Sequence, residues 1–319
     1  MVGHFQIITP VCFLVFNRPE TTSRVFEEIR RARPPKLLVV ADGPRLDRPG
    51  EAEKCDAVRA IIEQVDWPCE VLKNYTNTNM GCKRRVSSGL DWVFETVPEA
   101  IILEDDCVPD PSFFRYVEEL LTRYRDDERV MVIAALHFHG AAHTPPHSYF
   151  FSRYNHVWGW ASWRRAWQYY DREISLWPAL RDTDWLLAIG GGSKAFQQYW
   201  TKIFDTVHLG RVDTWDYQWT FSCWAQSGLA ILPARNLVTN VGFGEDATHT
   251  KDNGGAHASL QLEALNFPLS HPLTMVRDFA ADEWSDRHVF GIWEEAHWKK
   301  TIRKIPGVDI ARRALRRLR

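Results

Sequence analysis

The chain has 319 residues, 39 Lys and Arg against 41 Asp and Glu, a formal net charge of −2 and 45% hydrophobic residues. This balance is typical of a globular protein of one large domain or two fused small ones, and it excludes a disordered chain and a surface that coats nucleic acid. No stretch approaches the ~18 uninterrupted apolar residues that span a bilayer.

Apolar runs alternate with amphipathic segments along the first half of the chain. The runs have the length of buried strands and lie at 11–16, 37–41, 70–72, 100–103 and 130–135. The amphipathic segments predict helices from Pro19 to about Arg33, across 55–65, across 86–94 and from Pro111 to Tyr124. Strands that are apolar throughout and separated by such helices predict an α/β fold, with a Rossmann-like, mostly parallel sheet flanked by helices on both faces.

The second half is rich in aromatic residues and follows no such alternation. The chain holds 15 Trp and 17 Phe, and the Trp are concentrated here, between loop signals such as Gly190-Gly191-Gly192. Because no repeat or low-complexity linker separates the halves, we expect one globular unit. Its parts are an α/β half at 1–136, an aromatic-rich half at 137–298 and a basic tail at 299–319.

Three consecutive acids, Glu104, Asp105 and Asp106, follow the fourth predicted strand. Ligands of open parallel sheets bind beyond the carboxyl ends of the strands, so these acids are candidate site residues. Three carboxylates at a strand tip repel one another unless a cation lies among them, which favours Mn²⁺ or Mg²⁺. The alternative is that the acids cap the next helix, but Asp110-Pro111 already supplies an N-cap and a first helical proline.

Other polar residues follow the neighbouring strands. Arg18, after the first strand, suits a phosphate or a base edge, and Asp42, after the second, suits the donors of a base or ribose. Lys83, Arg84 and Arg85 stand at a predicted helix N-terminus, where the helix dipole disfavours cations, so an anionic ligand would explain their placement. Each residue alone is more often a solvated turn residue.

These motifs together resemble a known family. They are Asn17-Arg18-Pro19 and Asp42-Gly43 after strands, Asn-x-Gly before a helix, and Ile-Leu-Glu-Asp-Asp-x-x-x-x-Pro-x-Phe-Phe at 102–114. In this order they resemble nucleotide-sugar-dependent glycosyltransferases of the GT-A fold, especially bacterial family-2-like members and the N-acetylglucosaminyltransferase that starts complex N-glycans. The resemblance covers most of residues 10–250.

The resemblance implies roles for the strand-end residues. It implies that Asp106 ligates a Mn²⁺ or Mg²⁺ ion, that Asp105 contacts the ribose or the metal's waters, and that Glu104 faces the donor sugar. Arg18, Asp42 and Lys83 or Arg84 would line the nucleotide pocket. The implied donor is a nucleoside-diphosphate sugar, with a UDP-sugar favoured, and the 1–136 half would bind it.

The resemblance also implies roles in the second half, which would bind the acceptor. Trp158 and Trp160 would stack on sugars, although Trp160, Trp163 and Trp167 have helical spacing and could equally form core. Asp216 would be the general base of an inverting enzyme. Asp213 is the competing candidate, and an aspartate before an aromatic helix is often only an N-cap.

A histidine completes the implied site. His249 ends a loop that begins at Gly242, and in many GT-A enzymes such a loop closes over the donor with a histidine that reaches the metal or diphosphate.

The main prediction is therefore a metal-dependent glycosyltransferase. A sugar nucleotidyltransferase would require a glycine-rich loop after the first strand, where this chain has Asn-Arg-Pro. A haloacid-dehalogenase-type phosphatase would require Asp-x-Asp-x-Thr, where this chain has Glu-Asp-Asp-Cys-Val. A non-catalytic carbohydrate-binding protein on the same fold is the third alternative, and the intact acid triplet counts against it.

The C-terminal tail and the cysteines suggest where in the cell the protein is located. From Lys299 to Arg319 there are nine basic residues and one acid, and Val308, Ala311, Leu315 and Leu318 share one helical face. Such a helix binds an anionic membrane surface, next to a lipid-linked or other glycan acceptor, or else it is a solvated or interprotein helix. The six cysteines show no CxxC, and the N-terminus leaves little room for a signal peptide, so we expect a cytoplasmic protein, peripheral at the inner membrane face.

Overall fold

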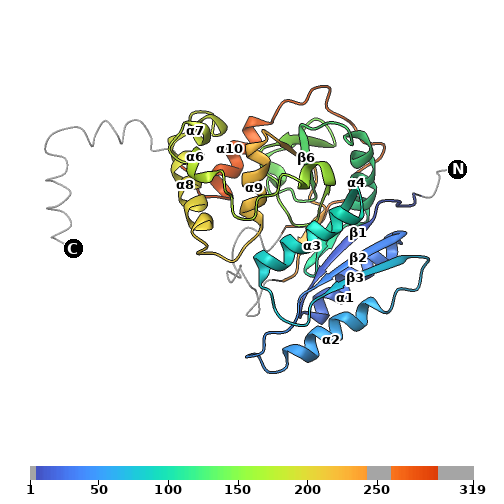
Figure 1. Ribbon diagram of the computed structural model, residues 1–319. Coiled ribbons are helices and arrows are strands. Elements are labelled where there is room, and N and C mark those ends of the chain that lie inside the picture. The colour runs from blue at the N-terminus through green and yellow to red at the C-terminus, as the bar shows by residue number, and fades with distance from the viewer. Residues whose placement is uncertain (1–4, 243–259, 294–319) are drawn as a thin grey trace, which may run out of the picture.

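An eight-stranded sheet forms the centre of the protein in a computed structural model that describes residues 5–242 and 260–293 (Figure 1). The strand order is β3-β2-β1-β4-β8-β6-β9-β7. These strands are β1 (Val11–Val15), β2 (Lys36–Ala41), β3 (Glu70–Tyr75), β4 (Glu99–Glu104), β6 (Val130–Ala134), β7 (Tyr149–Ser152), β8 (Trp160–Trp163) and β9 (Leu229–Pro233).

Parallel pairing dominates the half of the sheet that comes first in the sequence. β1 pairs in parallel with both β2 and β4, β2 with β3, and β6 with β9. β8 runs antiparallel between β4 and β6, and β7 runs antiparallel to β9. The predicted fold class, a Rossmann-like and mostly parallel sheet flanked by helices, is confirmed. Strands from the second half, β7, β8 and β9, belong to the same sheet.

Two helical layers cover the sheet, because successive residues of a strand point to opposite faces. Val11, Phe13 and Val15 of β1 pack with α1 (Pro19–Ala32), α2 (Glu51–Ile62) and α4 (Pro111–Arg123). Cys12 and Leu14 pack with α3 (Cys82–Thr96), α5 (Arg164–Trp167) and α9 (Asp216–Ala225). Figure 1 shows α1 and α2 on one side of β1–β3 and α3 on the other. The four predicted helices of the first half are confirmed.

The predicted helix cap at Asp110 is also confirmed. Asp110 Oδ1 accepts a hydrogen bond of 2.8 Å from the backbone N–H of Ser112, and Pro111 is the first helical residue. Such a cap stabilises a helix by about 1 kcal/mol. The acids 104–106 are therefore not needed to start α4.

Trp160, Trp163 and Trp167 do not lie on one helix, although their spacing in the sequence is helical. Trp160 and Trp163 lie on β8, and Trp167 ends the short helix α5. The remaining elements are β5 (Cys107–Pro109), which pairs with β10 (Val238–Asn240), the 3₁₀ turn η1 (Gly140–Ala142), and the helices α6 (Trp177–Leu180), α7 (Trp185–Ile189), α8 (Lys194–His208) and α10 (Phe279–His288). Trp177, Trp200, Phe204 and Trp224 form an aromatic core among the helices. Within residues 5–242 and 260–293, no helix is long and apolar enough to cross a bilayer.

Candidate functional site

A cavity of about 290 Å³ opens where β1, β2 and β4 end, and we call it the strand-end cavity. The parallel register aligns these ends, with Val15 opposite Ala41 and Leu14 opposite Glu104. The residues that follow each strand therefore meet at one edge of the sheet, as the sequence predicts. Of the predicted site residues, the cavity is lined by Arg18, Asp42, Glu104, Asp105, Asp106 and Trp158.

Arg18 binds the predicted metal-ligating carboxylate. Its Nη1 lies 2.7 Å from Asp106 Oδ2 and 3.7 Å from Asp105 Oδ1. Asp105 Oδ2 also accepts a hydrogen bond of 3.0 Å from the backbone N–H of Phe16. The ends of β1 and β4 are thus connected through the Arg18 guanidinium and the carboxylates of Asp105 and Asp106. The guanidinium compensates part of their negative charge.

The electrostatics of the acid triplet favour a further positive charge. Burial, with the charges of Asp106 and Asp105, raises the pKa of Glu104 well above its usual range. Burial and the Asp106 charge raise the pKa of Asp105 to about 7, although Arg18 and the Phe16 N–H lower it. A cation bound beside these carboxylates would reverse both shifts.

Asp42 holds a neighbouring turn. Its carboxylate accepts hydrogen bonds from Thr76 Oγ1 at 3.0 Å, Asn79 Nδ2 at 3.0 Å and the Met80 backbone N–H at 2.9 Å. Gly43 makes this close approach feasible, because a Cβ there would lie 2.4 Å from the Thr78 nitrogen. Asp42 therefore shapes the cavity wall in addition to lining it.

The N-terminus of α3 is capped from a distant segment. Asp213 Oδ2 accepts from the Cys82 N–H at 3.0 Å, and Asp213 Oδ1 accepts from the Lys83 N–H at 2.9 Å. The anion that the cationic start of α3 predicts is thus a carboxylate of the same chain. Asp213 also lines the strand-end cavity. Its role is not apparent in the sequence, and the only local sign is that Gly81, the N-cap of α3, has no side chain to cap with.

The cations at the start of α3 are placed differently from the prediction. Lys83 Nζ pairs with Glu173 at 2.8 Å, Arg84 is exposed, and neither lines the cavity. Arg85, the third cation of this run, which was not predicted to line the nucleotide pocket, lines it instead. Its Nε donates to the Ala41 carbonyl at 3.2 Å, which fixes it at the end of β2.

The predicted base, Asp216, lies on a second cavity of about 220 Å³ with mostly aromatic walls, which we call the aromatic cavity. Asp216 is the first residue of α9, and the Thr214 hydroxyl donates to its Oδ1. Trp158 lines both the aromatic cavity and the strand-end cavity. The charge of Asp216 is also among those that raise the pKa of Glu104, so the two acids lie within electrostatic reach.

Trp160 is not a sugar contact but part of the core, which is the alternative that its spacing left open. The ring of Trp160 is fully buried, and it packs against Trp215 and Trp219 at centroid distances of 5.7 and 6.1 Å. A sugar cannot reach it, because β8 points this side chain into the core under α9. Trp158, which comes before the strand, remains the accessible ring.

The structure describes only part of the predicted metal site. His249 and the basic tail at 299–319 lie outside the described residues. Among the residues that the structure describes, no three His, Cys, Asp or Glu side chains are grouped to hold a metal ion. Asp106 offers hard carboxylate oxygens, and ions such as Mg²⁺ are usually bound by one or two carboxylates together with substrate phosphates. The residues therefore fit an ion that binds together with a diphosphate.

Comparisons with known proteins give distant structural neighbours only. No family model and no curated protein matches the chain. A mannosyltransferase from Pyrobaculum calidifontis, in complex with GDP-Man and Mn²⁺, is 13% identical with a TM-score of 0.34, over 50% of this chain and 45% of that one. A UDP-glucose pyrophosphorylase complexed with UDP-glucose is 9% identical with a TM-score of 0.37, over 71% of this chain and 90% of that one. Mouse xyloside xylosyltransferase 1 is 11% identical with a TM-score of 0.30, over 67% and 81%. This chain thus spans less than half of the mannosyltransferase, and likenesses at these scores assign no function.

Proposed function

We propose that this protein is a glycosyltransferase that moves a sugar from a nucleoside-diphosphate-sugar donor to a hydroxyl acceptor, with inversion at the anomeric carbon. The donor binds in the strand-end cavity and the acceptor in the aromatic cavity. The observation that carries this proposal is that the two cavities share Trp158, with the acid triplet on one side and Asp216 on the other.

The donor side is built to hold a phosphorylated nucleoside. Arg18 offers guanidinium N–H groups to phosphate oxygens, and Asp42 and Asn79 offer polar atoms at the cavity wall. Apolar atoms of Leu14, Val15 and Val40 form the remaining surface, which suits the flat face of a base. By the family resemblance, a UDP-sugar is the favoured donor.

Asp106 would hold a divalent ion, with Asp105 beside it. When bound, Mn²⁺ or Mg²⁺ offsets charge on the leaving nucleoside diphosphate. Arg18 adds a second positive charge next to the same carboxylates. Glu104, which lines the same cavity, would face the donor sugar.

Asp216 would deprotonate the acceptor. The Thr214 hydroxyl donates to Asp216 Oδ1 and orients the carboxyl group, so Oδ2 is the atom that takes the proton. An acceptor hydroxyl in the aromatic cavity then attacks the anomeric carbon on the face opposite the leaving diphosphate. Aromatic walls suit a sugar, because rings such as Trp158 and Tyr217 can stack on its apolar face.

The acceptor is a glycan or a lipid-linked sugar. For a lipid-linked acceptor, the basic segment 299–319 would bring the enzyme to an anionic membrane surface at its cytoplasmic side. This part of the proposal rests on the sequence of the tail alone.

Thermal unfolding with a panel of nucleoside diphosphates, with and without Mn²⁺, tests the donor site. We expect one nucleotide to raise the melting temperature, more so with Mn²⁺, and Asp106→Asn to remove the Mn²⁺-dependent part. A matched control is Asp110→Asn, which changes a nearby aspartate that caps α4 and does not line the cavity. Equal stabilisation with EDTA and with Mn²⁺ would contradict the metal-assisted donor site.

A further inference from the structure

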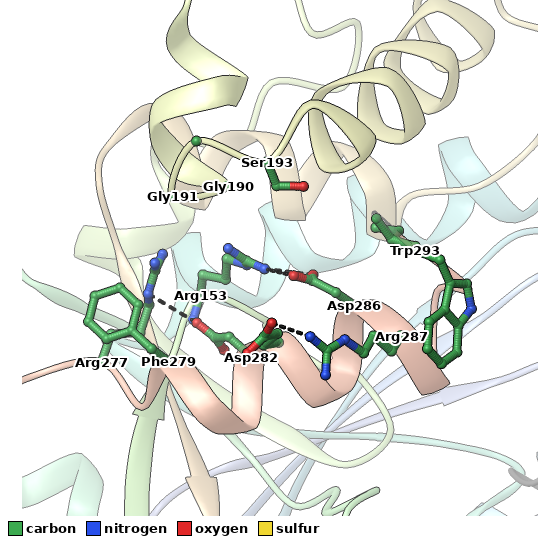
Figure 2. Close-up of a pocket in the computed structure, with 13 residues that line it drawn as sticks. Arg153, Gly190, Gly191, Ser193, Arg277, Phe279, Asp282, Asp286, Arg287 and Trp293 are labelled. Atoms are coloured by element: carbon green, nitrogen blue, oxygen red, sulfur yellow. Dashed lines mark hydrogen bonds and ion pairs between the residues drawn. The ribbon is translucent and has the colours of Figure 1, made fainter. Parts of the chain in front are cut away.

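A third cavity, of about 580 Å³, lies over α10, and we call it the α10 groove. Figure 2 shows α10 beneath it, the loop with Gly190, Gly191 and Ser193 above it, and Phe279 and Trp293 at opposite ends. None of its lining residues lines the strand-end cavity or the aromatic cavity. The proposed transferase chemistry gives it no role.

The charges that line the groove are balanced. Arg153 pairs with Asp286, Arg277 Nε lies 3.1 Å from Asp282 Oδ2, and Arg287 pairs with Glu283. Figure 2 shows the Arg153–Asp286 and Arg277–Asp282 pairs, with Arg287 beside them, along one surface. Three cations and three anions leave no net charge, so the groove favours neither a phosphate nor a polycation. Paired guanidinium and carboxylate groups still offer N–H donors and lone pairs to neutral hydroxyl groups.

The groove is held in place before any ligand binds. Arg153 is only 5% exposed, and its Nη1 donates to the Ile189 carbonyl at 3.0 Å. Arg277 Nη1 donates to the same carbonyl at 3.2 Å. Two arginines that line the groove thus hold the end of α7, and the Gly190-Gly191-Gly192 loop follows directly after it.

Two large rings stand open to solvent at the ends. Phe279 is 63% exposed and Trp293 is 62% exposed, and both line the groove. α10, ten residues long and about 15 Å in length, begins at Phe279, and Trp293 lies five residues after its last residue, His288. A pyranose ring has an apolar C–H face that stacks on an aromatic ring and hydroxyl edges that accept and donate hydrogen bonds. Open rings with balanced polar pairs between them match several such sugars in a row.

We infer that the α10 groove is a binding site for a neutral oligosaccharide, separate from the donor and acceptor cavities. The sugars at the two ends stack on Phe279 and Trp293, and those between them bind the exposed Arg287–Glu283 pair. This inference goes beyond the proposed function and does not rest on it, because the two sites have no lining residue in common.

An anion is the competing occupant, since the glycine loop precedes the N-terminus of α8. However, Ser193 Oγ already accepts from the Phe196 N–H at 3.0 Å, and three carboxylates line the same groove. Both features disfavour a phosphate there.

Titration calorimetry of the full chain with neutral oligosaccharides of glucose, mannose, galactose, xylose and N-acetylglucosamine tests the site. We expect at least one series to bind, with affinity that rises with chain length. Phe279→Ala and Trp293→Ala should each weaken it by about threefold to tenfold, the contribution of one stacking ring. Both side chains are mostly exposed, so the variants should fold. Leu273→Ala removes a side chain that is 97% exposed and outside the groove, and it should bind as the wild type does.

Three results would overturn the inference. The first is that no oligosaccharide of the panel binds. The second is that binding is unchanged in both ring variants, which would place the sugar in another cavity. The third is that inorganic phosphate binds the wild type and is lost in Arg287→Ala. A failure of the donor tests above, with oligosaccharide binding retained, would contradict the proposed transferase but not this site.

Discussion

Asp213 caps the helix that begins at Cys82, 131 residues earlier in the chain, with one carboxylate oxygen on each of the first two helical N–H groups. Three residues further on, Asp216 begins α9 on the wall of the aromatic cavity. The cap therefore links the donor side of the protein to the segment that carries the proposed base.

Removal of this cap should lower stability. Asp213→Ala leaves two N–H groups at the start of α3 without their acceptor, and we expect a loss of about 1–2 kcal/mol in the free energy of unfolding. Urea denaturation measures this difference. Asp184→Ala is the matched control, because Asp184 precedes α7 without a capping hydrogen bond from its side chain, and it should change stability by less than about 0.5 kcal/mol. Equal losses in the two variants would contradict the capping role.

Asp216→Asn should separate catalysis from donor binding. A carboxamide cannot take the acceptor's proton, so turnover should fall by about 10²–10⁴-fold. Donor affinity should stay close to that of the wild type, because the side chain does not line the strand-end cavity. Steady-state transfer rates and nucleotide titrations give the two quantities. If transfer survives in Asp216→Asn and is lost in a folded Asp213→Asn variant, the base is Asp213.

Arg18→Ala should make the protein depend on an added cation. Without the guanidinium, the carboxylates of Asp105 and Asp106 lose their compensating charge, and we expect a loss of about 1–3 kcal/mol in unfolding free energy. Mn²⁺ should restore more stability in this variant than in the wild type. Arg125→Ala breaks an exposed pair with Glu99, so it should cost less than about 1 kcal/mol and show no response to Mn²⁺. A response to Mn²⁺ that is the same in both variants would contradict the link between Arg18 and the acid triplet.

His139 should make the protein less stable below neutral pH. It is buried against the Ala281 carbonyl and Ser285, and burial lowers its pKa to about 4. The unfolded chain takes up this proton near pH 6.5, so the contribution of His139 to the unfolding free energy should fall as the pH drops from about 6.5 to 4, by up to about 3 kcal/mol. Urea denaturation at pH 7.5 and 5.0 measures the slope.

The slope contains opposing contributions, because burial raises the pKa of Asp282 to about 6, that of Asp105 to about 7 and that of Glu104 well above its usual range. The variant comparison isolates the histidine: His139→Gln should show less loss between the two pH values than the wild type. His208→Gln, at an exposed histidine, should keep the wild-type slope. The same slope in His139→Gln as in the wild type would show that His139 is not kept neutral by burial.

The features that depend on local sequence patterns were predicted correctly. Apolar runs identified β1, β2 and β4, and parallel pairing then requires that Arg18, Asp42 and Asp106 meet at one edge. The capping role of Asp213 could not be predicted, because it depends on a contact between segments 131 residues apart. For a similar reason the sequence left open whether Trp160 contacts a sugar or forms core. Its spacing from Trp163 and Trp167 suggested a helix, whereas pairing of β8 between β4 and β6 sets which way the ring points.

The most direct test of the account is the anomeric configuration of the product. Nucleoside-diphosphate sugars that bind in the thermal assay would be incubated with the protein, Mn²⁺ and a panel of sugar acceptors, and the coupling constants of the anomeric proton followed by NMR. We expect a glycoside of inverted configuration and a free nucleoside diphosphate, both lost in Asp216→Asn. A product of retained configuration would contradict Asp216 as the base. Formation of a nucleoside triphosphate and sugar 1-phosphate on addition of pyrophosphate, without glycoside, would contradict the transferase altogether.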